Sequence, residues 1–151
     1  MEIRPGDFTD PRVLELLREH LAGMHASSPP GSVYALDLSG LQHASIAFFT
    51  VWDGDDLLGC GALKQVDVGA GEIKSMRTAA RQLRRGVAAF LLEYLIELAR
   101  SRGYARISLE TGSGGAFEPA LALYRKYGFM PGEAFGDYVA TEFNQFLHLA
   151  M

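Results

Sequence analysis

Apolar residues recur along the chain at two spacings, one typical of helices and one typical of strands. A helix is predicted over 10–24, where an aspartate and a proline precede apolar residues at every third or fourth position. A second helix is predicted over 86–102, with a broad apolar stripe and Gly103 as the left-handed residue that ends it. A third is predicted over 119–127, and Gly128 ends it in the same way.

Strand patterns fill most of the chain between these helices. Residues 46–52 are rich in aromatic and β-branched types, and 57–68 return after a turn of aspartates and glycine as the second arm of a hairpin. A third strand is predicted over 72–78 after a glycine turn, and further strands over 105–111 and 143–149. Simple alternation in the third strand places four residues on one face: Glu72, Lys74, Met76 and Thr78.

The order of elements predicts an α/β fold, in which helices flank a mixed, mostly antiparallel α+β sheet. A chain of 151 residues, 48% of them hydrophobic, fits a single domain over 1–151 with one core. The net charge of −4, without any basic stripe, argues against nucleic acid as a partner. No segment has the apolar length of a membrane span or the pattern of a signal peptide, so we expect a soluble cytoplasmic protein without a membrane partner.

Cysteine and histidine give no sign of a thiol or metal centre. Cys60 is the only cysteine, which excludes an internal disulfide, and its apolar strand predicts a buried packing residue rather than a catalytic thiol. The histidines are scattered without metal-binding spacing, so no metal site is predicted. His25, at the end of the first helix, is the histidine with a candidate substrate role. Trp52, Phe48 and Phe49 are predicted to lie in the hydrophobic core rather than to contact a ligand.

The segment 76–88 carries the candidate chemistry. A strand leads into a short basic loop, and the loop opens into the long helix at Gly86. The first N–H groups of a helix have no intrahelical acceptor, and the helix dipole adds positive potential there. Gly86 allows close approach to the backbone, and Ala88 keeps the first turn small. With the arginines nearby, the segment predicts a diphosphate site, although a capped helix with a solvated basic end is the alternative. The segment lacks the P-loop motif G-x-x-x-x-G-K-[ST], and it lacks the dinucleotide-binding motif G-x-G-x-x-G followed by an acidic residue about 20 positions later.

This segment resembles motif A of the GCN5-related N-acetyltransferase (GNAT) superfamily, written [Q/R]-x-x-G-x-[G/A]. Gly86 and Ala88 occupy its small-residue positions. Leu83 stands at the Gln/Arg position and Arg84 where a second glycine is frequent, so both depart from the motif. The departures remove a side-chain contact to phosphate but leave the backbone donors, and Arg84 or Arg85 could supply charge.

Other parts of the chain extend the resemblance, which covers nearly its whole length and is strongest over 72–130. Residues 120–129 are similar to the end of the GNAT motif B, A-x-x-L-Y-x-x-x-G-F. Phe117 stands where many members have an asparagine that binds the cofactor. Within the superfamily, residues 71–76 and 135–138 resemble a small bacterial subgroup of the YsnE type.

The resemblance implies the GNAT acyl-CoA N-acyltransferase fold and an acetyl-CoA-dependent N-acetyltransferase. Such an enzyme transfers the acetyl group to a primary amine of a small-molecule or amino-acid-like acceptor by direct attack. Glu72 is then the candidate base that takes the amine proton, and Tyr124 the candidate donor to the departing thiolate. A backbone N–H near the end of the 72–78 strand would polarise the thioester oxygen. The expected acetyl-CoA contacts are Met76, Arg77, Thr78, Arg84, Arg85, Gly86, Val87, Ala88, Ala89 and Tyr124.

Two other functions compete with this one at the sequence level. A non-catalytic acyl-CoA-binding or sensing module is favoured by the departures at Leu83 and Phe117, whereas Glu72 and Tyr124 favour the enzyme. A nucleotide-binding protein is the third interpretation. Residues Glu110 and Thr111 end a strand next to the expected site and are candidates for acceptor contact. The family resemblance also raises the expectation of a homodimer.

Overall fold

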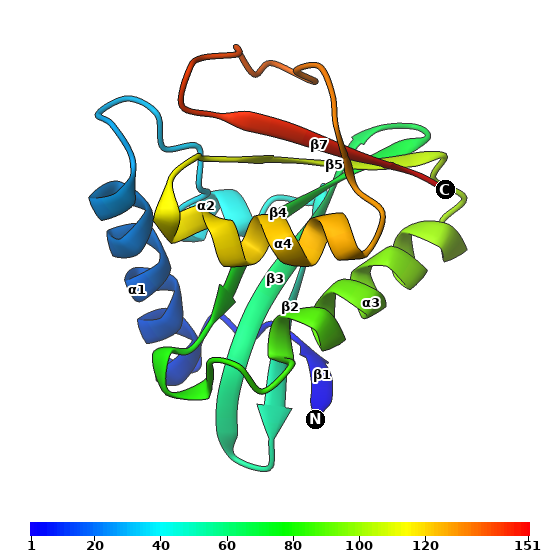
Figure 1. Cartoon of the computed structure of the whole chain (residues 1–151). Helices are drawn as coiled ribbons and strands as arrows, with labels where there is room; N and C mark the ends of the chain where they lie inside the picture. The colour runs from blue at the N-terminus through cyan, green and yellow to red at the C-terminus, as the bar shows by residue number, and fades with distance from the viewer.

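A computed structural model describes the whole chain, residues 1–151. Seven strands form one sheet in the order β1-β2-β3-β4-β5-β7-β6, and helices cover both of its faces (Figure 1). The elements in chain order are β1 (Glu2–Pro5), α1 (Pro11–Ser27), α2 (Leu38–Leu41), β2 (Ile46–Asp53), β3 (Asp56–Asp67), β4 (Ala70–Thr78), the 3-10 turn η1 (Ala80–Gln82), α3 (Val87–Ser101), β5 (Arg106–Thr111), the 3-10 turn η2 (Gly115–Phe117), α4 (Glu118–Lys126), β6 (Met130–Pro131) and β7 (Gln145–Ala150).

The caps predicted from the sequence set the ends of the long helices. Asp10 caps α1, because its carboxylate accepts a hydrogen bond of 2.9 Å from the backbone N–H of Arg12. Helix α3 begins after Gly86, which has a left-handed φ of 78°, and the chain leaves it through Gly103 with a φ of 75°. The predicted fold class and the three long helices are therefore confirmed.

The sheet separates two apolar cores. The larger core lies between the sheet and helices α3 and α4, and includes Leu91, Leu95 and Leu121. The smaller core lies on the other face, where residues of α1 and α2 pack around Trp52 and Cys60. Both of these residues are buried, as predicted, and burial raises the pKa of the Cys60 thiol to about 12.

Short elements account for most differences from the predicted strands and helices. Helix α2 lies in the connection that showed no pattern, and Asp37 caps it by accepting a hydrogen bond of 2.8 Å from the N–H of Gly40. Strand β4 begins at Ala70 rather than at Glu72, and the two residues of β6 pair with β7. Elements this short have no periodicity of their own to detect, because tertiary contacts hold them in place.

Strand β4 departs from simple alternation at Ser75. Lys74 pairs with Ala62 and Arg77 pairs with Cys60, so two residues of β4 lie opposite the single residue between Cys60 and Ala62. Ser75 has a left-handed φ of 57°. This is a β-bulge, which inserts one extra residue and moves every following side chain to the other face.

The bulge corrects the predicted faces of this strand. Met76 packs against the larger core rather than beside Lys74. Arg77 takes the place beside Lys74, because its strand partner Cys60 and the partner of Lys74, Ala62, both belong to the smaller core. One face of the strand therefore carries Glu72, Lys74 and Arg77.

Strands β4 and β5 separate after a short parallel contact. Only residues 70–72 of β4 pair with residues 106–108 of β5. From Ile73 to Thr78 the edge of β4 that faces β5 has no strand partner, and α4 lies in front of β4 in this part of the molecule (Figure 1). Unpaired backbone groups along such an edge are available to a ligand.

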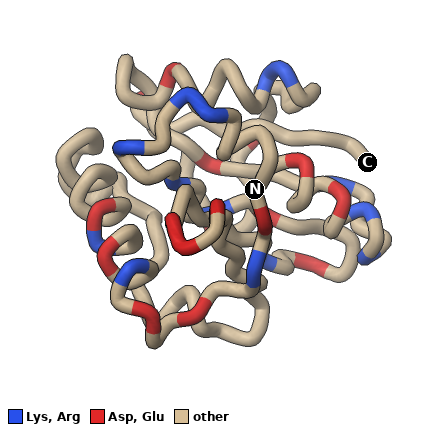
Figure 2. The backbone as a smooth tube through the Cα atoms, turned by 90° about the horizontal axis from the view of Figure 1, so that it is seen from below, with Lys and Arg blue, Asp and Glu red and all other residues tan.

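Acidic and basic residues are not gathered in separate regions of the fold (Figure 2). Acidic and basic positions are interspersed along the chain, with one small acidic group at the turn between β2 and β3 (Figure 2). No helix combines the length and the apolar character that crossing a bilayer would require. The charges that matter for function are therefore local ones.

Candidate active site

A pocket of about 730 Å³ opens where β4 and β5 separate. Its lining comes from α1, β4, β5, α3 and α4, so it passes from one side of the sheet towards the other. One end is formed by the start of α3, and the other by polar side chains under α1. We refer to these as the α3 end and the α1 end.

The α3 end has the features of an anion site. Gly86 through Ala89 line it, at the first turn of a helix of 15 residues. Arg84 lines it as well, and its backbone has a left-handed φ of 66°. Glycine adopts this conformation without strain, and this explains why glycine is frequent at the motif position that Arg84 occupies here. Free N–H groups, the helix dipole and left-handed loop residues together suit a diphosphate.

Two residues of the basic loop differ from their expected roles. Arg85 turns away from the pocket, because its guanidinium donates to the side chain of Gln82 and, at 3.3 Å, to the carboxylate of Asp53. Only Arg84 is thus placed to supply the extra charge. Leu83 lines the pocket and remains 60% exposed, so an apolar side chain borders the site where the family pattern has a polar one.

Tyr124 faces the middle of the pocket from α4. The ring is buried in the larger core and meets Phe129 edge-on at 5.6 Å between centroids. Burial raises the pKa of its phenol, so the group stays protonated at neutral pH. None of the hydrogen bonds within the protein involves its hydroxyl, whereas the hydroxyl of Tyr127, the residue after α4, donates to Glu93 at 2.5 Å. Tyr124 therefore holds a proton free for a ligand.

Glu72 lies at the α1 end, but its carboxylate is already engaged. Its Oε2 accepts hydrogen bonds from the Tyr138 hydroxyl at 2.5 Å and from Lys74 Nζ at 3.2 Å. Lys74 also donates to the same tyrosine hydroxyl at 2.6 Å. Both side chains of the Glu72–Lys74 ion pair are less than a tenth exposed. These contacts occupy Oε2 of Glu72, so this carboxylate is less free to contact an acceptor amine than a carboxylate without partners.

Glu110 is a second carboxylate on the pocket wall. It stands near the end of β5, half-buried, and forms no ion pair. Burial raises the pKa of its carboxyl to about 6, against the lowering effects of the Asn144 amide and the Lys74 ammonium. A general base is most effective when its pKa lies near the working pH, so the pKa of Glu110 suits it to the role of a base.

His20 and Arg77 form a polar contact under α1. Arg77 Nε donates to His20 Nδ1 at 3.1 Å, and Arg77 Nη2 donates to the His20 backbone carbonyl at 3.2 Å. His20 is 6% exposed, and burial together with the arginine charge lowers its pKa to about 4. The ring is therefore neutral at physiological pH and carries its proton on Nε2.

The depressed pKa of His20 should make the fold less stable in mild acid. In the unfolded chain this ring has a pKa near 6.5, so it takes up a proton there before it does in the folded protein. The stabilisation is present above about pH 6.5 and is lost as the pH falls towards 4. Between pH 7.5 and pH 5.0 we expect this group to cost about 2 kcal/mol of the free energy of unfolding. Urea denaturation of His20→Gln should show a correspondingly smaller loss than the wild type; an equal loss would contradict the assignment.

Sequence reasoning missed part of the α1 end. His20 had a signal, because it follows Val13 and Leu16 on the buried face of α1 at helical spacing. His25, the histidine chosen instead, is exposed and does not line the pocket. Tyr34 and Tyr138 meet edge-on at 5.2 Å; Tyr34 comes from a connection that showed no pattern, and Tyr138 from the segment 135–138, which indicated a subgroup but no contact. Phe117 is buried and packs against Phe143.

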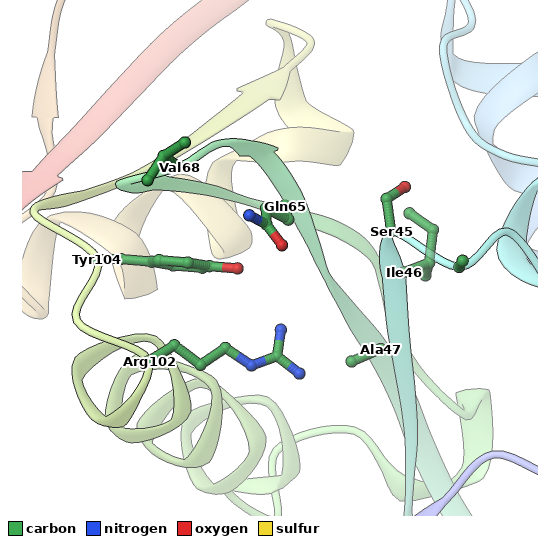
Figure 3. Close-up of a pocket in the computed structure, with 8 residues that line it drawn as sticks. Ser45, Ile46, Ala47, Gln65, Val68, Arg102 and Tyr104 are labelled. Carbon is green, nitrogen blue, oxygen red and sulfur yellow. The ribbon is translucent and has the colours of Figure 1, made fainter.

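A second hollow, of about 360 Å³, lies apart from this pocket at the far end of α3. Arg102 and the hydroxyl of Tyr104 point into it towards Gln65 and the start of β2 (Figure 3). It shares no lining residue with the pocket between β4 and β5. The candidate chemistry is therefore confined to the pocket between β4 and β5.

Comparison with known proteins gives relatives over the whole chain. The model of the acetyltransferase (GNAT) family matches residues 12–129. The uncharacterized N-acetyltransferase YsnE of Bacillus subtilis is 51% identical over 138 residues, which are 91% of this chain and 91% of the relative. The uncharacterized N-acetyltransferase YedL of Escherichia coli is 43% identical over 149 residues, 99% of this chain and 94% of the relative. A Bacillus subtilis acetyltransferase solved in complex with CoA has a TM-score of 0.73 at 21% identity, with 99% of this chain and 98% of that chain covered.

Proposed function

Because this chain belongs to the acetyltransferase (GNAT) family, as an acetyl-CoA-dependent N-acetyltransferase related to YsnE, we propose that it acetylates a primary amine of a small-molecule or amino-acid-like acceptor. The observation that carries the proposal is the continuity of the pocket, which joins the start of α3 to Tyr124 and to the carboxylates of Glu72 and Glu110. The whole chain, 1–151, would act as one catalytic domain without a metal.

Acetyl-CoA would lie along the separated edge of β4. Its pyrophosphate would bind the backbone N–H groups of residues 84–89, with Arg84 adding charge. The pantetheine arm would pass the unpaired backbone of residues 76–78, where an N–H can polarise the thioester oxygen. Helix α4 would hold Tyr124 beside the sulfur. The CoA complex of the Bacillus subtilis structural relative supports this donor.

The reaction requires a deprotonated amine and a protonated leaving group. The amine nitrogen attacks the thioester carbon, and the bond from that carbon to sulfur breaks. We assign the amine proton to Glu110, because its pKa of about 6 lies near neutral pH and its carboxylate forms no ion pair. Glu72, the base expected from family position, would instead hold Tyr138 and Lys74 in place. Tyr124 would donate its proton to the thiolate.

The two carboxylates can be separated by their pH dependence. If Glu110 is the base, kcat/KM of the wild type should rise as the pH passes about 6, when this carboxyl loses its proton. Glu110→Gln should lower turnover about 30-fold and remove that rise, since proton transfer to a positioned base is worth at least this much. Glu72→Gln, the matched change, should mainly raise KM. Rates would be followed by release of free thiol between pH 5 and 9. A retained rise in Glu110→Gln, and its loss in Glu72→Gln, would return the role to Glu72.

The function itself is tested by the release of free CoA from acetyl-CoA in the presence of a panel of primary amines. Turnover with at least one amine, together with mass-spectrometric detection of the acetylated product, is the expected result. Tight CoA binding without turnover for any amine would favour the non-catalytic module instead. Thermal stabilisation by ATP in the absence of CoA would favour a nucleotide-binding protein.

A further inference from the structure

The acceptor end of the pocket contains a cation without an anionic partner. The guanidinium of Arg77 is half-buried under α1 and lines the pocket, yet none of the ion pairs of the chain includes it. Lys74 on the same face of β4 is paired with Glu72. Arg77 is thus the one positive charge at the α1 end that no carboxylate neutralises.

The contacts of Arg77 orient its charge without cancelling it. Both hydrogen bonds go to His20, through Nδ1 and the backbone carbonyl, and the ring is neutral because its pKa is lowered to about 4. A guanidinium has five N–H donors, so three remain for a ligand. They form the planar fork that binds a carboxylate in a two-point contact.

Helix α1 holds this guanidinium in position at Gly23. A Cβ at residue 23 would lie 2.7 Å from Nη2 of Arg77, so a side chain at this position would displace the guanidinium from its present place. His20 and Gly23 lie three residues apart on α1 and both touch the guanidinium. The head group is therefore fixed before any ligand arrives, and this reduces the ordering cost of binding.

The acidic wall of the pocket lies a short way along the sheet from Arg77. Glu72 pairs with Ser108, and the Lys74 ammonium is close enough to Glu110 to lower the pKa of its carboxyl, so Glu110 lies near Lys74, three residues before Arg77 along β4. Three residues of strand span roughly 10 Å, and the long arginine side chain shortens the gap between the charged groups. An acceptor with an ammonium group at one end and an anion at the other fits this pair of charges.

We propose that the acceptor is an amino acid, whose carboxylate binds Arg77 while its amine faces Glu110; this inference rests on the proposed N-acetyltransferase function. His20 is then a positioning residue, which acts through Arg77. The uncharged counterpart of such an acceptor, with the carboxylate replaced by a carboxamide, should be a much poorer substrate, because it leaves the guanidinium without its partner.

The test compares amino acids, both α and ω, with their carboxamides in the wild type and in Arg77→Gln. Arg77→Gln should lower kcat/KM about 30-fold for the preferred acid, mainly through KM, and less than 3-fold for its carboxamide. The quantity compared between variants is the ratio of kcat/KM for the acid to kcat/KM for its carboxamide. This comparison cancels the different intrinsic reactivity of the two amines. Arg77→Lys keeps the charge but not the fork, and should lie in between. Arg106→Gln, an exposed arginine outside the pocket, is the matched control and should change neither rate.

Two further readouts separate carboxylate recognition from folding and from the acyltransfer reaction. CoA affinity and the melting temperature should stay close to wild type in Arg77→Lys, which excludes a general loss of structure. Calorimetric binding of the amino acid to the CoA-saturated protein should weaken in Arg77→Gln even where turnover is not measured. Equal losses for acid and carboxamide, or a wild type that turns over amines without preferring the carboxylate, would overturn the proposal. Absence of turnover with calorimetric binding intact would count against the proposed function and not against the carboxylate site.

Discussion

Gly86→Glu should abolish acetyl-CoA binding, with an expected rise of the dissociation constant of at least about 1000-fold. The variant puts a carboxylate at the start of α3, where the pyrophosphate is expected to lie, so two anions would compete for the same N–H groups. It also forces a side chain into a left-handed conformation with a φ of 78°, which costs about 1–2 kcal/mol. Isothermal titration calorimetry with CoA measures the effect directly.

Two control variants divide this effect into strain and charge. Gly86→Ala carries the strain alone, and nothing lies within 4 Å of the added Cβ, so it should bind CoA with a loss of about 10-fold or less. Gly103→Glu introduces the same residue at a φ of 75° at the other end of α3, far from the pocket, and should keep CoA affinity. If Gly86→Glu still bound CoA, the start of α3 would not be the pyrophosphate site.

Tyr124→Phe should lower kcat about 100-fold while leaving CoA affinity within about 3-fold of wild type. Burial raises the pKa of the phenol and no hydrogen bond within the protein engages its hydroxyl, so its proton is available to the leaving thiolate. Removal of the hydroxyl leaves the ring, which keeps its edge-on contact with Phe129 and its place in the core. Steady-state kinetics with a saturating amine separates the two effects.

Tyr127→Phe is the matched control for this variant. It removes a hydroxyl from the end of the same helix, one that donates to Glu93 outside the pocket. Turnover should not change, although the melting temperature will fall slightly with the lost hydrogen bond. A reporter acyl donor with a more acidic thiol should partly restore Tyr124→Phe, because such a thiolate leaves without a proton. Unchanged turnover in Tyr124→Phe would remove it as the acid.

The cofactor end of the site could be predicted because its signals are local. Helix caps, the left-handed glycine and the small first turn of α3 each depend on residues within one turn of one another. The same holds for α4, where Pro119 lies in the first turn, Gly128 follows the end of the helix with a left-handed φ of 95°, and Tyr124 is on the buried side. The structure places all of the predicted cofactor residues except Arg85 in the pocket lining, but Arg77 lies at the α1 end, where we assign it to the acceptor instead.

The acceptor end depended on contacts between distant parts of the chain. Arg77 reaches His20 across 57 residues, and Tyr138 reaches Glu72 across 66. Neither contact produces a periodic pattern in the sequence, because periodicity reflects the spacing of residues within one element and not contacts between elements. The β-bulge at Ser75 is the decisive case, because alternation alone placed Arg77 on the face opposite Lys74.

The sequence by itself therefore determined the fold class, the order of the elements and the left-handed turn at Gly86 that we propose as the anion site, all of which follow from interactions between near neighbours. Only the tertiary structure decided which side chains meet under α1. One extra residue in β4 moves Arg77 beside Lys74, and the packing of α1 then sets His20 and Gly23 against its guanidinium. The physical reason is that strand register and helix packing are set by the whole sheet, and a shift of one residue exchanges its faces.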